Sequence, residues 1–288
     1  MIIKNKKELD ILREGGKRLA AVLAEVADFA KIGTTTKALD ELAEKLILKA
    51  GGKPSFKGYQ VHRAPMPYPG SLCVSINEEV VHGIPNDRVL KKGDIVGLDI
   101  GMWYEGLCTD TAMTVLVPTA QDFQDFSQRD GDDLPAGRQG LSNSPAGEYA
   151  GLEKPDAKAI RLINATRKSL EIGIKEVRAG VPVGDIGHAI QQYLEKNGFG
   201  VVRELVGHGV GRAVHEEPEI PNWGVKGEGD ELFEGMVIAL EPMATEGNFK
   251  VKLAQDGWTW VTRDGSRSAH FEHTLVVTRS GSEVFTRI

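Results

Sequence analysis

The sequence repeats itself, and this repeat limits the fold more than any other feature. The helical pattern of residues 33–51 returns at residues 180–198, at a constant offset of 147 residues. Further along each copy, an apolar run ends in an acid, at Asp99 in the first copy and at Glu241 in the second. Two copies of one unit are expected to pack about a pseudo-two-fold axis, with their strands in one curved antiparallel sheet. We therefore predict a duplicated α+β fold with two pairs of helices outside the sheet.

Apolar residues at helical spacing predict the helices of each copy. Amphipathic helices are expected over residues 8–31 and 155–178, and each is followed by a second helix. Residues 33–36 are expected to cap the second helix of the first copy, and residues 180–185 that of the second copy.

The segments between the helices predict the domain organisation. Residues 53–69 hold several prolines and are expected to form a loop, whereas Leu72–Ile76 is expected to form a strand. Residues 119–154 are rich in Gly, Ser, Asp, Gln and Pro and lack apolar periodicity, which is typical of a low-complexity insertion. We expect a single catalytic domain of two similar halves, at about residues 1–118 and 155–288, with this insertion between them.

Residues 93–117 form a predicted β-hairpin, with two apolar runs on either side of a turn at Tyr104–Gly106. Each run carries one aspartate, Asp99 in the first and Asp110 in the second. Because side chains alternate between the faces of a strand, a loop with an even number of residues places both carboxylates on one face. Two half-buried anions at that distance repel each other, and a divalent metal ion between them would remove the repulsion.

The hairpin alone also allows an interpretation without a metal ion. Asp110 could begin a turn, and Asp99 could pair with a distant lysine or arginine. The two interpretations are equally supported at this point, and the rest of the chain must decide between them.

Three more candidate ligands lie in the second half. Glu241 ends an apolar run, and Glu272 lies in a strand pattern beyond the turn signal Asp264-Gly265. His208 and His215 belong to a run whose glycines allow close approach of the backbone. Four carboxylates and one imidazole suit two adjacent divalent ions such as Mn, Fe, Co or Zn. The candidate metal ligands are Asp99, Asp110, His208, Glu241 and Glu272.

Six motifs are spread along the chain: Val80-Val-His82-Gly-Ile-Pro85, Gly-Leu-Asp99, Asp110-Thr, Gly207-His208-Gly-x-Gly-x-x-x-His215-Glu-Glu-Pro218, Leu-Glu241-Pro-Met243 and Phe-Glu272-His-Thr274. Together they resemble the motifs of the methionine aminopeptidases of the bacterial type I form. The resemblance covers nearly the whole chain except residues 119–154. It implies the "pita-bread" fold, which is the duplicated architecture expected from the repeat. It also implies removal of the initiator methionine from nascent proteins when the next residue is small.

The resemblance implies a role for each candidate ligand. Asp99 would chelate one metal ion, while His208 and Glu241 would complete the site of the other. Asp110 and Glu272 would bridge both ions. Water activated by the two cations would attack the scissile carbonyl carbon, and Glu241 would accept its proton.

The resemblance also implies roles around the substrate. His215 would hydrogen-bond the substrate carbonyl as it becomes an oxyanion, and His82 would contact the scissile amide nitrogen. The free amine would lie against one metal ion, so that only the N-terminal residue is cut. Tyr68, Cys73 and Trp258 would form the methionine pocket, where sulfur–aromatic contacts are favourable.

Two alternatives remain at this stage. A prolidase or aminopeptidase P shares the fold but carries a large additional N-terminal domain, whereas only about 70 residues precede the first sheet motif here. A metal-free binding protein could also use this scaffold after losing its ligands. All five ligand positions carry usable side chains, which favours an enzyme.

Composition and sequence pattern exclude several other classes of protein. The formal net charge of −6 opposes non-specific binding to nucleic acids or anionic membranes. Two cysteines provide no disulfide framework, and the N-terminal residues lack the apolar core of a signal peptide. No apolar run reaches the ~18 residues that a membrane span needs. We expect a cytoplasmic monomer that acts on N-terminal methionyl peptides and nascent chains, with a contact to the ribosome left open.

Overall fold

The computed structural model describes residues 1–61, 64–117 and 156–287. The predicted insertion at 119–154 lies outside the described residues. The predicted helices are present, with ends that differ from the prediction by about two residues. They are α1 (Lys6–Phe29), α2 (Thr36–Lys49), α4 (Ala157–Glu176) and α5 (Val183–Lys196).

The predicted cap is confirmed for α2 and wrong for α5. Thr35 caps α2, because its side chain accepts a hydrogen bond from the backbone N–H of Ala38 at 3.1 Å. The equivalent position before α5 is Pro182, which has no side-chain acceptor to offer. Asp185 lies in the first turn of α5, and its carboxylate accepts from the backbone N–H of Gly227 at 2.6 Å. This aspartate therefore ties a loop to the helix instead of capping it.

A nine-stranded sheet runs through the middle of the molecule, and all of its pairings are antiparallel. Its main path is β1-β4-β5-β14-β9-β7-β8, while β2 pairs with β4 and β15 pairs with β14. The strands are β1 (Lys53–Pro54), β2 (Leu72–Ile76), β4 (Ile95–Tyr104), β5 (Leu107–Leu116), β7 (Val206–Gly209), β8 (Glu216–Pro221), β9 (Val237–Leu240), β14 (Glu272–Val277) and β15 (Ser282–Val284).

Two small sheets contain the remaining strands of the described residues. The small sheets contain β6 (Gly200–Val201), β10 (Met243–Thr245) and β13 (Ser268–His270), and β3 (Glu79–Val81), β11 (Val251–Leu253) and β12 (Trp260–Thr262). The prediction of a loop over residues 53–69 is wrong at its start, where β1 pairs Lys53 with Trp103. Pro54 is tolerated there because β1 is an edge strand, where a missing backbone N–H breaks no ladder.

The repeat is visible as equivalent hydrogen bonds in the two halves. The backbone N–H of Gly33 donates to the carbonyl of Leu90 at 3.0 Å, and that of Gly180 donates to the carbonyl of Leu232 at 2.8 Å. Both glycines have positive φ angles near 80–90°, which a residue with a side chain rarely adopts. The same turn therefore begins α2 and α5, and the predicted duplication is confirmed.

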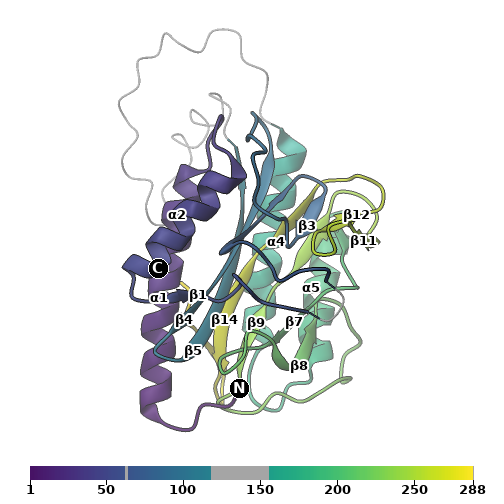
Figure 1. Ribbon diagram of the computed structural model, residues 1–288. Coiled ribbons are helices and arrows are strands. Elements are labelled where there is room, and N and C mark those ends of the chain that lie inside the picture. The colour runs from purple at the N-terminus through teal and green to yellow at the C-terminus, as the bar shows by residue number, and fades with distance from the viewer. Residues whose placement is uncertain (62–63, 118–155, 288) are drawn as a thin grey trace, which may run out of the picture.

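The two helix pairs pack on the outside of the sheet (Figure 1). α1 contacts β4 and β5, while α5 contacts β8 at the other end of the sheet. Each half has its own apolar cluster, with Leu39 and Ile100 fully buried in the first and Ile190 and Leu275 in the second. Truncating such a side chain to alanine typically costs about 2–5 kcal/mol, so these clusters hold the helices on the sheet.

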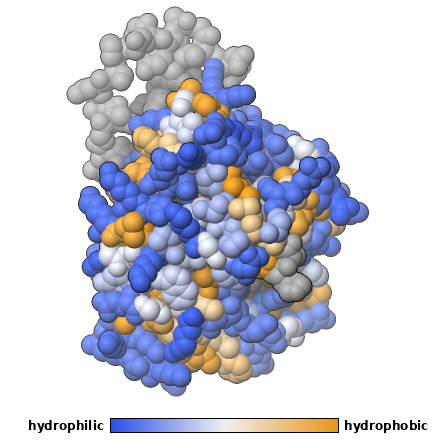
Figure 2. Space-filling model, viewed as in Figure 1, coloured by the Kyte–Doolittle hydropathy of each residue, from blue (hydrophilic) through white to orange (hydrophobic). Residues whose placement is uncertain are grey.

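The visible surface is mostly hydrophilic, with small scattered hydrophobic groups (Figure 2). Among the described helices, none has the length and apolar character that crossing a membrane requires.

Candidate metal centre

All ten residues singled out from the sequence line one cavity of about 530 Å³. They come from both halves of the chain, and the cavity therefore lies where the halves meet. The residues are Tyr68, Cys73, His82, Asp99, Asp110, His208, His215, Glu241, Trp258 and Glu272.

The hairpin places its two aspartates on the same face of the sheet, as predicted. Its turn has two residues, Glu105 and Gly106, with φ angles of 45° and 85°, which suit a tight hairpin turn. Asp99 lies directly opposite Ala112, so Asp110 is its diagonal neighbour. Both carboxylates therefore face the cavity.

Further site residues lie directly opposite Asp99 and Ala112 on the adjacent strands. Cys73 lies opposite Asp99 on β2, and Glu272 lies opposite Ala112 on β14. Residues directly opposite each other in an antiparallel pair point to the same side. The thiol, the Asp99 carboxylate and the Glu272 carboxylate therefore share one face.

Strands β7 and β9 position two more site residues from the second half of the chain. His208 on β7 lies opposite Ala239 on β9, and Glu241 follows two residues later and thus points to the same side. Gly207 lets the two strands approach, since a β-carbon there would come within 2.4 Å of the Ala239 carbonyl oxygen. This is the close approach that the glycine-rich run predicted.

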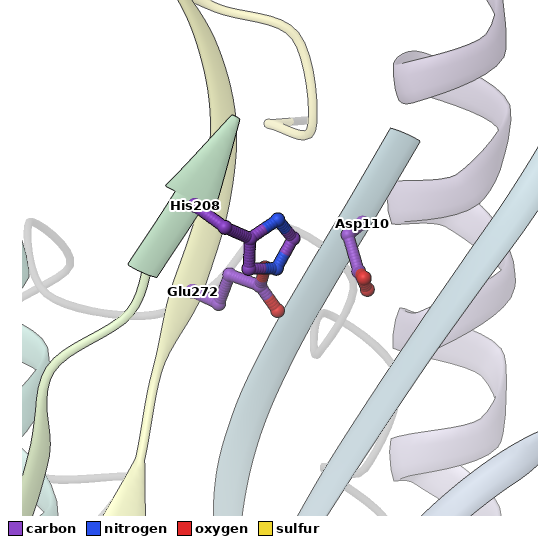
Figure 3. A group of neighbouring side chains, drawn as sticks. All are labelled: Asp110, His208 and Glu272. Carbon is purple, nitrogen blue, oxygen red and sulfur yellow. The ribbon is translucent and has the colours of Figure 1, made fainter. Parts of the chain in front are cut away.

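Three of the predicted ligands converge most tightly. Figure 3 shows the side chains of Asp110, His208 and Glu272 pointing toward one another from β5, β7 and β14. One ligand atom of each lies within 4.8 Å of the others. Glu241 adjoins this group, because its Oε1 lies 3.4 Å from the Nε2 atom of His208.

Without a cation, the negative charges of the buried carboxylates of the site are energetically unfavourable. Burial raises the pKa of Asp99 well above its usual range, and the neighbouring Asp110 raises it further. Burial also raises the pKa of Asp110 to about 7, and that of Glu272 well above its ordinary value. Within the part of the chain that the structure describes, one buried oxygen of Asp99 and one of Glu272 have no hydrogen-bond partner. Divalent cations would satisfy both the charge and the unpaired oxygens.

The protonation state and the tautomer of His208 both suit binding of a metal ion through Nε2. Burial lowers the pKa of this imidazole to about 3, so the ring is neutral at neutral pH. Its Nδ1 lies 2.9 Å from the carbonyl oxygen of Gly209, an acceptor that fixes the proton on Nδ1. The lone pair of Nε2 then faces a carboxylate oxygen of Glu241. Two electron-pair donors at 3.4 Å are an arrangement that fits a cation between them.

The other two predicted histidines lie beside the cluster. The rings of His215 and His208 meet edge to face with centroids 4.4 Å apart. His82 has a backbone φ of 60°, which is uncommon for a residue with a side chain and typical of functional sites. Both histidines line the cavity, and their roles in the reaction stay predictions.

Comparisons with known proteins agree with this geometry. The family model of metallopeptidase family M24 matches residues 10–130 and 148–279. "Methionine aminopeptidase 1" of Bacillus subtilis (strain 168) is 41% identical over 288 residues, with 100% of both chains covered. The chain belongs to the methionine aminopeptidases of metallopeptidase family M24. This confirms the family that the six motifs predicted.

Solved structures confirm the predicted fold. The crystal structure of methionine aminopeptidase from Thermotoga maritima superposes with a TM-score of 0.83 at 39% identity, with 100% of both chains covered. The X-Pro aminopeptidase from the same organism has a TM-score of 0.67 at 18% identity, and the chain covers 62% of it. The second likeness shows the fold alone.

The predicted methionine pocket lies in the same cavity as the buried carboxylates. The Tyr68 and Trp258 rings meet edge to face with centroids 5.2 Å apart, and Cys73 is buried beside them. The Tyr68 hydroxyl donates to the carbonyl of Gly83 at 2.8 Å, so its ring is held in place. The assignment of these side chains to the substrate's methionine stays a prediction.

Three residues of the site were missed by the sequence analysis. The Tyr59 hydroxyl lies 2.8 Å from Nδ1 of His215, and Asn222 donates to the backbone carbonyl of Glu241 at 3.0 Å. The Nε2 atom of His270 lies 3.5 Å from Oε2 of Glu241. Strand alternation gave no signal for His270, because His270 ends β13 and the chain passes into another sheet at Phe271.

Proposed function

We propose that this protein is a metal-dependent aminopeptidase that removes the N-terminal methionine when the next residue is small. The observation that carries the proposal is the cluster of buried carboxylates with a neutral imidazole, on one face of the sheet beside an apolar pocket. The relatives named as methionine aminopeptidases support methionine as the residue removed.

The proposed cofactor is a pair of divalent ions, of which Mn, Fe, Co and Zn all accept this ligand set. Asp99 would serve one ion, and His208 and Glu241 the other. Asp110 and Glu272, on neighbouring strands, would bridge the two. When bound, such ions act as Lewis acids and lower the pKa of water toward neutrality.

The side chains of the chain itself would position the substrate and move protons. Glu241 would accept a proton from the attacking water, since its carboxyl lines the cavity and lies beside the ligand atom of His208. His215 would donate from Nε2 to the developing oxyanion. This role requires the tautomer in which the Tyr59 hydroxyl donates to Nδ1, at the observed 2.8 Å. His82, which also lines the cavity, would contact the scissile amide nitrogen.

The pocket would select the substrate side chain. A thioether gains from contact with the ring edges of Tyr68 and Trp258 and with the thiol of Cys73. We further propose that the chain acts as one catalytic domain, since the site takes residues from both halves. Cytoplasmic localisation, a monomeric state and action on nascent chains are parts of the same proposal.

A peptide assay tests the proposal. The metal-loaded protein should cut Met-Ala-Ser and leave both acetyl-Met-Ala-Ser and an Ala-Pro peptide intact, as followed by mass spectrometry. Rapid cleavage of the Ala-Pro peptide would favour the Xaa-Pro peptidase alternative. Absence of both bound metal and cleavage would favour the metal-free binding protein on the same scaffold.

A further inference from the structure

His270 is a buried imidazole whose position is fixed by the backbone. It ends β13, directly before the chain passes through Phe271 into β14 and the large sheet. The Thr114 hydroxyl donates to the His270 carbonyl at 2.7 Å, and the His270 N–H donates back to that hydroxyl oxygen at 2.8 Å. The residue is 3% exposed. Its ring therefore has little freedom to turn away from the cluster.

The ring faces one particular atom of the cluster. Its Nε2 lies 3.5 Å from Oε2 of Glu241, while Oε1 of the same carboxylate lies 3.4 Å from Nε2 of His208. The Nε2 atom of His270 is buried and has no other hydrogen-bond partner among the described residues. The carboxylate is thus placed between two imidazoles, with one oxygen toward each.

The two imidazoles differ in what they can offer to Glu241. In His208 the proton belongs on Nδ1, next to the Gly209 carbonyl, so its Nε2 carries a lone pair. The Nε2 atom of His270 faces the acceptor Oε2 of Glu241, which favours an N–H there, because two lone pairs at this distance would repel. A shift of a few tenths of an ångström would give a normal hydrogen bond.

We propose that His270 is a positioning residue for Glu241, which donates from Nε2 to Oε2 and keeps Oε1 turned toward His208 and the metal ions. The inference rests on the proposed function, in which Glu241 is both a ligand and the proton acceptor. Asn222 holds the other end of the same residue, because its side-chain amide donates to the Glu241 carbonyl at 3.0 Å. Backbone and carboxylate of Glu241 are then both fixed, as is usual for carboxylates that ligate metals.

Two amide substitutions separate this role from simple packing. In His270→Gln the side-chain amide reaches about as far as Nε2 and can still donate to Glu241. In His270→Asn the amide reaches only about as far as Nδ1 and cannot. His273→Asn is the matched control, since this half-buried imidazole bonds the Thr286 hydroxyl at 3.0 Å and does not line the cavity.

Metal binding is measured by calorimetric titration of the metal-free proteins with Mn²⁺, alongside kcat and KM on Met-Ala-Ser. We expect His270→Asn to weaken metal affinity and lower kcat roughly 10- to 100-fold, the usual effect of losing an outer partner of a ligand. The number of ions bound and KM should change little. His270→Gln should recover most of both losses, and His273→Asn should resemble the unmodified protein.

Three outcomes would overturn the proposal. Equal metal affinity in His270→Asn and His270→Gln would show that donation from the Nε2 position is not used. Loss of one bound ion in both variants would make His270 a ligand. Equal losses in His273→Asn would indicate a general effect of removing a buried imidazole. If the unmodified protein binds metal but leaves Met-Ala-Ser uncut, the proposed function fails, and the calorimetry still decides the role of His270.

Discussion

The hydroxyl of Tyr59 lies 2.8 Å from Nδ1 of His215, and this contact joins a loop of the first half to the second half of the chain. Donation by the hydroxyl keeps the proton of the neutral imidazole on Nε2. We expect Tyr59→Phe to lower kcat roughly 2- to 10-fold, the effect of one ordinary hydrogen bond. Metal stoichiometry should not change. Steady-state kinetics check this, and an unchanged kcat would show that the contact does not select the tautomer.

His215 and His208 should respond differently to removal. His215→Ala should lower kcat roughly 10²- to 10³-fold with little change in KM, because the lost hydrogen bond strengthens mainly in the transition state. His208→Ala should also weaken metal binding. Titration of both variants with Mn²⁺ while activity is followed separates the two roles. Rescue of His215→Ala by excess metal would mean that His215 is a ligand.

Asp110→Asn tests the bridging position. An amide cannot bridge two cations as a carboxylate does, so the variant should lose at least one ion and nearly all turnover. The metal-free variant should be at least as resistant to heat as the metal-free parent, because a buried charge near Asp99 is gone. Metal analysis and thermal unfolding measure the two effects. Full metal occupancy with a normal rate would contradict the assignment.

Stability without metal should depend on pH through Asp110. Its pKa is raised from 3.8 to about 7, so the folded chain holds this proton more tightly than the unfolded chain does. The resulting stabilisation is complete below pH 3.8 and is lost as the pH rises through about 7. Unfolding of the metal-free protein by urea, measured between pH 5 and 8 in steps of about one unit, should show this fall. Asp110→Asn should remove this part of the slope.

Metal affinity should change with pH in the opposite direction. A bound proton on Asp110 must leave before a cation can bind, so the contribution of Asp110 should make the apparent affinity rise with pH up to about 7. The rise is up to about tenfold per pH unit for each proton displaced. Calorimetry in buffers of different ionisation enthalpy counts the protons released. Binding without proton release would show that the acids are ionised in the metal-free protein.

Much of the site could be predicted because strand geometry is regular. One of the positions 99 and 110 is odd and the other is even. Both aspartates therefore share a face when the turn has an even number of residues, and the turn has two. The apolar run that ends in Glu241, like the run that ends in Asp99, likewise marked this acid as the counterpart of Asp99 in the second copy, and Glu241 directly follows β9. These relationships depend only on side-chain alternation and on the duplication, both of which are visible in the sequence.

Contacts made by irregular segments could not be predicted in the same way. The approach of Tyr59 to His215 depends on the path of a loop, for which no periodicity exists. The approach of His270 to Glu241 depends on the chain changing sheets at Phe271. The cap of α5 was wrong because the repeat preserves the turn at Gly180 but replaces the capping threonine with Pro182.

The central claim is that a metal centre lies between strands of the two halves, and anomalous diffraction from crystals loaded with Mn²⁺ tests it most directly. The predicted result is anomalous density between the carboxylates of Asp110 and Glu272, within bonding distance of Nε2 of His208. Density elsewhere on the protein, with none between these carboxylates at saturating Mn²⁺, would contradict the account.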